Sequence, residues 1–73
     1  MTNTELLMDY VKKSGLKLGF IAENLNLSRF GLAKKINNES EFKASEIEKL
    51  CNLLHITSMT DRSRIFFAQE VDK

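Results

Sequence analysis

The spacing of apolar residues constrains this chain most, because it repeats at three and four residues and no segment shows a convincing strand pattern. Apolar side chains at i, i+3, i+4 and i+7 line one face of an α-helix. Such a face runs without a gap through Ile47, Leu50, Cys51 and Leu54. We therefore predict an all-α fold of four to five short helices, with Cys51 in the core.

Three of these helices are predicted in the N-terminal half. Thr2 and Glu5 have capping-box spacing for the first helix, and Gly15 is a natural left-handed stop. Its inner stripe comprises Leu6, Leu7, Tyr10, Val11 and Ser14. The second stripe comprises Leu18, Ile21, Ala22 and Leu25, and the third comprises Leu32, Ala33 and Ile36. Asn37 and Asn38 are expected to end the third helix, because asparagine tolerates positive φ.

The C-terminal half gives one firm helix and one short one. Ser45 and Glu48 have capping-box spacing for the helix that carries Cys51, and His55 stands where this helix is expected to stop. Ile56 is expected to fold back onto the core. Thr60 and Asp61 are candidate caps for a fifth helix that extends through Arg64. Residues 65–68 form an apolar run that is too short for the spacing of its side chains to show whether it is helical or extended.

Size and composition exclude several classes of protein. Seventy-three residues make one domain, residues 1–73. One histidine and one cysteine cannot supply a catalytic set or a metal centre, so we expect no enzyme and no cofactor. No apolar run exceeds the four residues 65–68, and no basic-then-apolar leader precedes Thr2. We therefore expect a cytoplasmic protein without a membrane partner.

The distribution of charge is more informative than its sum. The net charge is +1, which gives no support to nucleic-acid binding by itself. Between Asn24 and Asn38, however, there is no acidic residue, and Arg29, Lys34 and Lys35 give a local charge of +3. This segment is the predicted third helix and its flanks.

Residues 17–37 have the organisation of a helix-turn-helix unit, whose second helix can enter the major groove of DNA. Ala22 is small where two helices would cross closely, and Asn26 suits the tight turn over residues 24–27. Leu27 and Leu32 are expected to fill the wedge between the helices. Ser28 is a good N-cap for the second helix, and the functional face is expected to begin there.

Two stretches carry a resemblance to a known family: GLKLGFIAENLNLSR at residues 15–29 and KKINNESEF at residues 34–42. The chain resembles the Cro/cI-type (lambda-repressor-like, XRE) helix-turn-helix family over roughly residues 4–73. Within it, the second stretch and the ending over residues 65–73 resemble small regulators of temperate phages of Gram-positive bacteria. The resemblance implies a transcriptional regulator of a lysis–lysogeny switch that binds double-stranded operator DNA.

The resemblance also implies roles for individual residues. Arg29, Phe30 and Lys34 would face base edges, and an arginine can bind guanine through two hydrogen bonds. Lys17, Ser28 and the loop over residues 37–43 would lie near phosphates. Lys35 adds to the basic segment, although the family usually has an apolar core residue there and Ile36 would take its place. The predicted DNA-binding set is Lys17, Ser28, Arg29, Phe30, Lys34, Lys35, Asn37, Asn38 and Lys43.

Two departures from the family pattern favour a protein partner instead. Leu18 stands where a glutamine is common, and Phe30 occupies a base-reading position that is normally polar. Exposed hydrophobes suit a protein partner better than a polyanion. The alternative function is therefore an antirepressor, or modulator of repression, which binds a partner repressor. Its predicted contacts are Leu18, Phe30, Phe66 and Phe67, and residues 60–73 would contact that partner or form a homodimer.

Structural explanations compete with both functions. Arg29, Lys34 and Lys35 can simply be a solvated face. Phe30 can pack against Ile21 or Leu25, and the two helices can be a purely structural pair. Phe66 and Phe67 can equally belong to the core.

Overall fold

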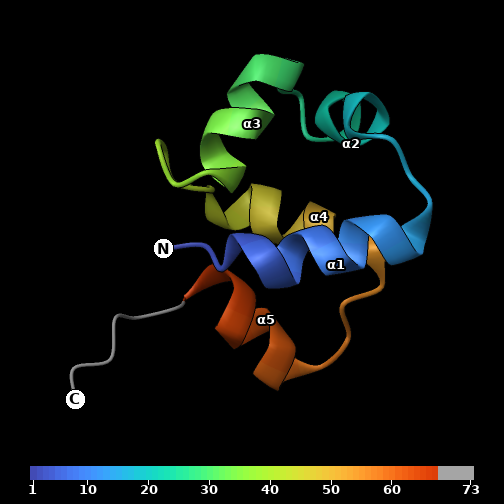
Figure 1. The fold of residues 1–73 in the computed structure, drawn as a ribbon, viewed down its shortest axis with the longest axis vertical. Helices are drawn as coiled ribbons and strands as arrows, with labels where there is room; N and C mark the ends of the chain where they lie inside the picture. Colours follow the sequence, from blue (N-terminus) through green and yellow to red (C-terminus); the bar gives the residue numbers. More distant parts are fainter. Residues whose placement is uncertain (68–73) are drawn as a thin grey trace.

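A computed structural model describes residues 1–67, which form five helices and no strand. The helices are α1 (Thr4–Ser14), α2 (Leu18–Asn24), α3 (Arg29–Ile36), α4 (Ala44–Leu54) and α5 (Met59–Phe66). The prediction of an all-α fold is therefore confirmed for the described part of the chain. Figure 1 shows α2 and α3 together at one end of the molecule, α1 and α4 across the middle, and α5 at the opposite end.

The N-terminal end of α1 differs from the predicted capping box. Asn3 caps the helix, because its side-chain oxygen accepts a hydrogen bond from the backbone N–H of Leu6 at 3.1 Å. Thr2 is not the cap, and its backbone N–H and C=O are instead bound to the side chain of Asn38 at 2.7 and 2.8 Å. At the other end, Gly15 has the predicted left-handed conformation with φ of 75°. The first helix is thus correctly placed, but its cap is one residue later.

The prediction that Ser45 and Glu48 cap α4 is wrong. The helix begins at Ala44, and Lys43 holds the N-cap position. The carboxylate of Glu46 accepts a hydrogen bond from the backbone N–H of Lys43 at 2.8 Å, so it satisfies one free donor at this end. The C-terminal end agrees with the sequence, since His55 stops the helix in the left-handed region with φ of 58°. Ile56 is buried, as predicted.

Helix α5 begins earlier and ends later than the sequence suggested. Ser58 caps it by accepting a hydrogen bond from the backbone N–H of Asp61 at 3.2 Å, so Thr60 and Asp61 are not the caps. The helix continues through Ile65 and Phe66, both of which are buried. Burial of these two side chains favours helix over an extended segment. Ala68 lies outside the described residues.

The core receives side chains from all five helices. Leu7, Ile21, Leu32, Leu50 and Ile65 are the largest fully buried side chains. The predicted face of α4 is buried in full, including Cys51. Phe42, from the segment between α3 and α4, lies edge-on against Phe66 with ring centroids 5.6 Å apart. The segment that follows α3 therefore packs against the last turn of α5.

Helix α5 is held against α1 by polar contacts at two places. The backbone N–H of Asn3 donates to the carbonyl of Ile65 at 2.6 Å. The hydroxyl of Tyr10 donates to the carboxylate of Asp61. This hydrogen bond, together with burial and the negative charge of Asp61, raises the pKa of Tyr10. The end of the molecule that carries α2 and α3 takes no part in these contacts.

Candidate nucleic-acid interface

The turn between α2 and α3 has the predicted conformation. Asn26 lies in the left-handed region with φ of 63°. The backbone N–H of Leu27 donates to the carbonyl of Ala22 at 2.9 Å, which folds the chain back onto α2. Ala22 is 1% exposed and Leu32 is equally buried, so the two helices meet at a small residue and a leucine. The helix pair expected over residues 17–37 is therefore present, with the outer side of α3 left free of the core.

Ser28 and Gly31 form a tight pair at the start of α3. The Ser28 hydroxyl oxygen accepts a hydrogen bond from the backbone N–H of Gly31 at 2.9 Å, which confirms Ser28 as the N-cap. A Cβ atom placed on Gly31 would lie 3.2 Å from the same oxygen, closer than most Cβ contacts. Gly31 therefore leaves room for the capping hydroxyl of Ser28. This explains why glycine, which otherwise weakens a helix, occurs at this position.

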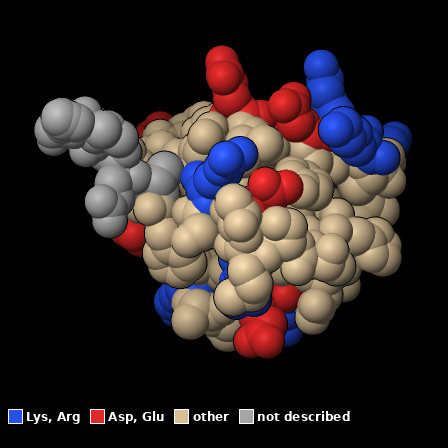
Figure 2. Space-filling view, turned by 90° about the horizontal axis from the view of Figure 1, so that it is seen from below, with Lys and Arg blue, Asp and Glu red and all other residues tan. Residues whose placement is uncertain are grey.

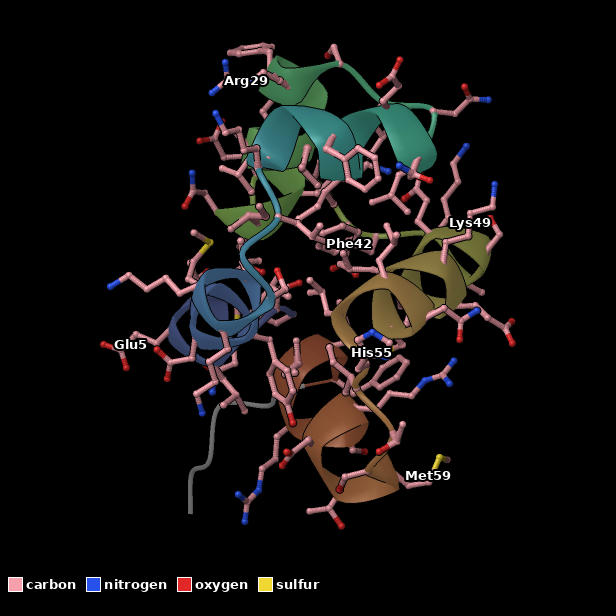
Figure 3. The ribbon with its side chains drawn as sticks, turned by 90° about the vertical axis from the view of Figure 1, so that its right-hand side faces the viewer. Glu5, Arg29, Phe42, Lys49, His55 and Met59 are labelled. Carbon is pink, nitrogen blue, oxygen red and sulfur yellow. The ribbon has the colours of Figure 1, made fainter. Side chains whose placement is uncertain are left out.

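Arg29 begins α3, and its side chain lies over α2. A Cβ atom on Gly19 would lie 3.5 Å from Cδ of Arg29, so the arginine stem crosses the surface that this glycine leaves bare. Arg29 is exposed, and Figure 3 shows it at the α2–α3 end of the molecule, far from α5. The stem of Arg29 is thus supported by α2 while the guanidinium stays accessible to a ligand.

Phe30 is exposed instead of packed. Its side chain is 74% exposed, so the interpretation in which it tucks against Ile21 or Leu25 is wrong. The Lys34 ammonium lies 5.5 Å from the centre of the Phe30 ring, within range of a cation–π interaction. These two residues are one helical turn apart and lie together on the accessible side of α3.

Lys35 does not belong to this accessible surface, which corrects the prediction that it contacts DNA. Its Nζ lies 2.6 Å from Oε1 of Glu46, and the whole residue is only 9% exposed. A buried ammonium needs such a partner, because an unpaired charge in the interior is costly. Burial alone would raise the pKa of Glu46, but the hydrogen bonds from Lys35 and from the Lys43 backbone, with the charges of both lysines, hold it below its usual value.

The loop over residues 37–43 is only partly available for phosphates. Asn38 has φ of 68°, and its side-chain amide binds the backbone of Thr2 through both its oxygen and its nitrogen. We correct the prediction for Asn38 accordingly, because its amide anchors the N-terminal segment. Asn37 does not have the expected positive φ, since its φ is −92°. Asn37 and Lys43 are both exposed, so both side chains are accessible for the phosphate contacts that were predicted for them.

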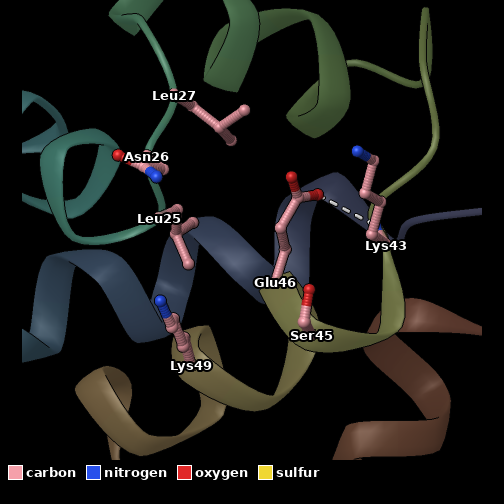
Figure 4. A pocket seen from close by; sticks show the side chains of 7 residues that line it. All are labelled: Leu25, Asn26, Leu27, Lys43, Ser45, Glu46 and Lys49. Atoms are coloured by element: carbon pink, nitrogen blue, oxygen red, sulfur yellow. Dashed lines mark hydrogen bonds between the residues drawn. The ribbon is translucent and has the colours of Figure 1, made fainter.

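A cleft lies between the turn after α2 and the start of α4. It has a volume of about 340 Å³ and is lined by Leu25, Asn26, Leu27, Lys43, Ser45, Glu46 and Lys49. Figure 4 shows the side chains of α4 facing this turn, with the hydrogen bond from Lys43 to Glu46 at the edge of the cleft. Lys49 was not among the predicted contacts, and the N-cap of its helix was predicted two residues late, at Ser45 instead of Lys43.

The predicted partner contacts are scattered. Leu18 is only partly exposed and packs against the core. Phe66 is 4% exposed, so the prediction that it contacts a partner is wrong and the alternative, in which it belongs to the core, is confirmed. Phe67 is exposed, but it follows α5, whereas Phe30 lies on α3. Phe20 on α2 is 49% exposed and was not predicted. Lys17, by contrast, lies exposed just before α2, as a phosphate contact requires.

The opposite end of the molecule has a mixed surface. Figure 2 views the molecule from the α5 end and shows basic side chains beside acidic ones, with uncharged surface between them.

Within residues 1–67, no cluster of His, Cys, Asp and Glu side chains is placed to hold a metal ion. No helix in this part of the chain has the length and apolar character needed to cross a membrane. The outer side of α3 is therefore the strongest candidate site.

The chain matches no family model, no curated protein and no solved structure. The likeness to the Cro/cI-type family thus stays a prediction from the sequence, beside the geometry described above.

Proposed function

We propose that this chain is a DNA-binding protein of the helix-turn-helix class, and that α3 is its recognition helix. One observation carries the proposal: Arg29 and Lys34 lie on the accessible side of a helix whose other side is buried in the core. No acidic residue occurs between Asn24 and Asn38, so nothing on this helix repels a phosphate backbone. The N-terminal residues of a recognition helix contact base edges in the major groove.

Each polar group at this candidate interface then has a role that suits its chemistry. Arg29, supported by α2, donates to O6 and N7 of a guanine. Lys34 binds a base edge or a phosphate one turn further along α3. Lys17, Asn37 and Lys43 bind phosphates around the helix, and Lys49 adds a further cation at the cleft beside α4.

The resemblance to small temperate-phage regulators supports the biological role. We infer a transcriptional regulator of a lysis–lysogeny switch that acts in the cytoplasm of a bacterial host. Such proteins bind two half-sites about one helical turn of DNA apart, roughly 34 Å, and therefore act as dimers. The exposed side chains of Met59, at the start of α5, and Phe67, just after it, are the candidate homodimer contacts.

The antirepressor is the second candidate, and the 74% exposure of Phe30 favours it. A protein partner would bury this ring in a pocket, as aromatic side chains at interfaces often are. The partner would be a phage repressor. The burial of Phe66 and the partial burial of Leu18 weaken this alternative, because a stable interface needs more apolar area than one ring supplies.

Selection of binding sites from a pool of random duplex DNA tests the proposal. The purified chain should enrich one sequence without any partner, and the logarithm of its affinity should fall linearly with the logarithm of salt concentration. Failure to enrich any sequence would contradict direct DNA binding. If the chain instead forms a complex with the repressor encoded beside it, and Phe30→Ala abolishes that complex, the antirepressor function is supported.

A further inference from the structure

The Phe30 ring is an apolar group in a polar and basic setting. It directly follows Arg29 and is 74% exposed. Within residues 1–67, Phe42 and Phe66 are the only aromatic side chains in contact with each other, so Phe30 and Phe20 do not stack. Within the described residues, the Phe30 ring thus lies beside one cation, Lys34, and stacks on no other aromatic ring.

This setting suits DNA better than it suits a protein. A protein-binding patch depends on neighbouring apolar area, and Leu18, the nearest candidate in the sequence pattern, packs against the core. The major groove of DNA offers a single apolar group among polar ones, the C5-methyl group of thymine. An exposed ring that stacks on no other aromatic side chain and lies beside a lysine complements that combination.

Resting on the DNA-binding function proposed above, we propose that Phe30 selects a thymine by contact with its methyl group, in the same half-site as the guanine bound by Arg29. The N-terminal residues of a recognition helix contact base edges in the major groove, and Phe30 is the second residue of α3. The half-site therefore contains both a guanine and a thymine.

Lys34 prepares the ring for this contact. Its ammonium, 5.5 Å from the ring centre, restricts the positions of the Phe30 side chain before DNA arrives. A side chain that is already ordered loses less entropy on binding. The same ammonium stays close to the DNA, so Lys34 contributes to affinity both through its charge and through the ring it holds.

Replacement of thymine by deoxyuridine removes only the methyl group and keeps every hydrogen bond of the base pair. In the duplex selected by the wild-type chain, each thymine is replaced in turn and binding is followed by fluorescence anisotropy. One replacement should weaken wild-type binding about fourfold, the effect of about one buried methyl group. Phe30→Ala should bind the thymine duplex more weakly by a similar factor and should no longer distinguish thymine from deoxyuridine.

Phe20→Ala is the matched control, because it removes another exposed ring from the same helix pair. This variant should keep the full preference for thymine. If no thymine matters to the wild-type chain, or if Phe30→Ala retains the preference, the methyl contact is excluded while DNA binding stands. If no duplex is selected at all, DNA binding fails and the methyl contact fails with it. Circular dichroism of Phe30→Ala verifies that the variant is folded.

Discussion

Nζ of Lys35 lies 2.6 Å from Oε1 of Glu46, which joins the last turn of α3 to the first turn of α4. The same carboxylate oxygen accepts the backbone N–H of Lys43 at 2.8 Å. One carboxylate therefore fixes both ends of the segment that connects the two helices. That segment carries Asn37 and Lys43, so the ion pair also orders part of the proposed phosphate-binding surface.

Breaking this pair on one side should destabilise the fold. Lys35→Met and Glu46→Gln should each lower the free energy of unfolding by about 1–3 kcal/mol, because each leaves a buried charge without its partner. The double variant should lose less than the sum, as residues in direct contact are coupled. Urea denaturation measures all four proteins. Glu48→Gln, an exposed change on the same helix, should have little effect, and additivity of the two single changes would contradict the coupling.

Stability should depend on pH through Glu46. Its pKa is lower in the folded protein than the ordinary value of 4.5, so its contribution is present above that value and is lost as pH falls through the folded pKa. The difference in unfolding free energy between the wild-type chain and Glu46→Gln should therefore shrink as the solution is acidified below about pH 4.5. Thermal unfolding at several pH values provides this difference. A difference that grows toward low pH would show that the pKa is not lowered.

Gly31 and Ser28 should show a non-additive effect. Alanine at a helical position is favoured over glycine by about 1 kcal/mol, but at Gly31 its Cβ would crowd the Ser28 hydroxyl at 3.2 Å. Gly31→Ala alone should therefore change the free energy of unfolding little. In a Ser28→Ala background, itself destabilised by about 1 kcal/mol through loss of the cap, the same change should be stabilising. Equal effects in both backgrounds would show that crowding is absent.

The single cysteine, Cys51, should react only slowly with thiol reagents while the protein is folded. Burial raises the pKa of Cys51, aided by Glu48 and opposed by Arg62, so the thiol is protonated near neutral pH. Reaction with a thiol reagent should be slow in buffer and should accelerate in parallel with unfolding as urea is added. Because the chain has only one cysteine, the signal has one source. Fast labelling of the native protein would contradict the buried position on α4.

The helices could be predicted from the sequence because their signals are local. The spacing of Ile47, Leu50, Cys51 and Leu54 and the conformational preference of Asn26 each depend on a few neighbouring residues. The predicted ends were less accurate, because several potential caps compete within each segment. Thr2 is excluded as a cap by Asn38, 36 residues away, and no local pattern reports such a contact.

The residues of the candidate site show the same difference between local signals, which the sequence reveals, and long-range contacts, which it does not. Ser28, Arg29 and Lys34 were found because they follow a turn and lie on one side of a helix. Lys35 was misplaced because its burial depends on Glu46, which lies on a different helix. The exposure of Phe30 and the partial burial of Leu18 depend on how α2 and α3 pack against the core, which the spacing of apolar residues does not specify.

The central claim is that the outer side of α3 binds DNA, and two arginine variants test it most directly. Arg29 is exposed on α3, and Arg64 is exposed on α5 at the opposite end of the molecule, so their replacement by alanine changes the net charge equally. By fluorescence anisotropy on the selected duplex, Arg29→Ala should lose about 1–3 kcal/mol of binding free energy, whereas Arg64→Ala should bind almost as the wild-type chain does. Equal losses, or wild-type binding by Arg29→Ala, would contradict the claim.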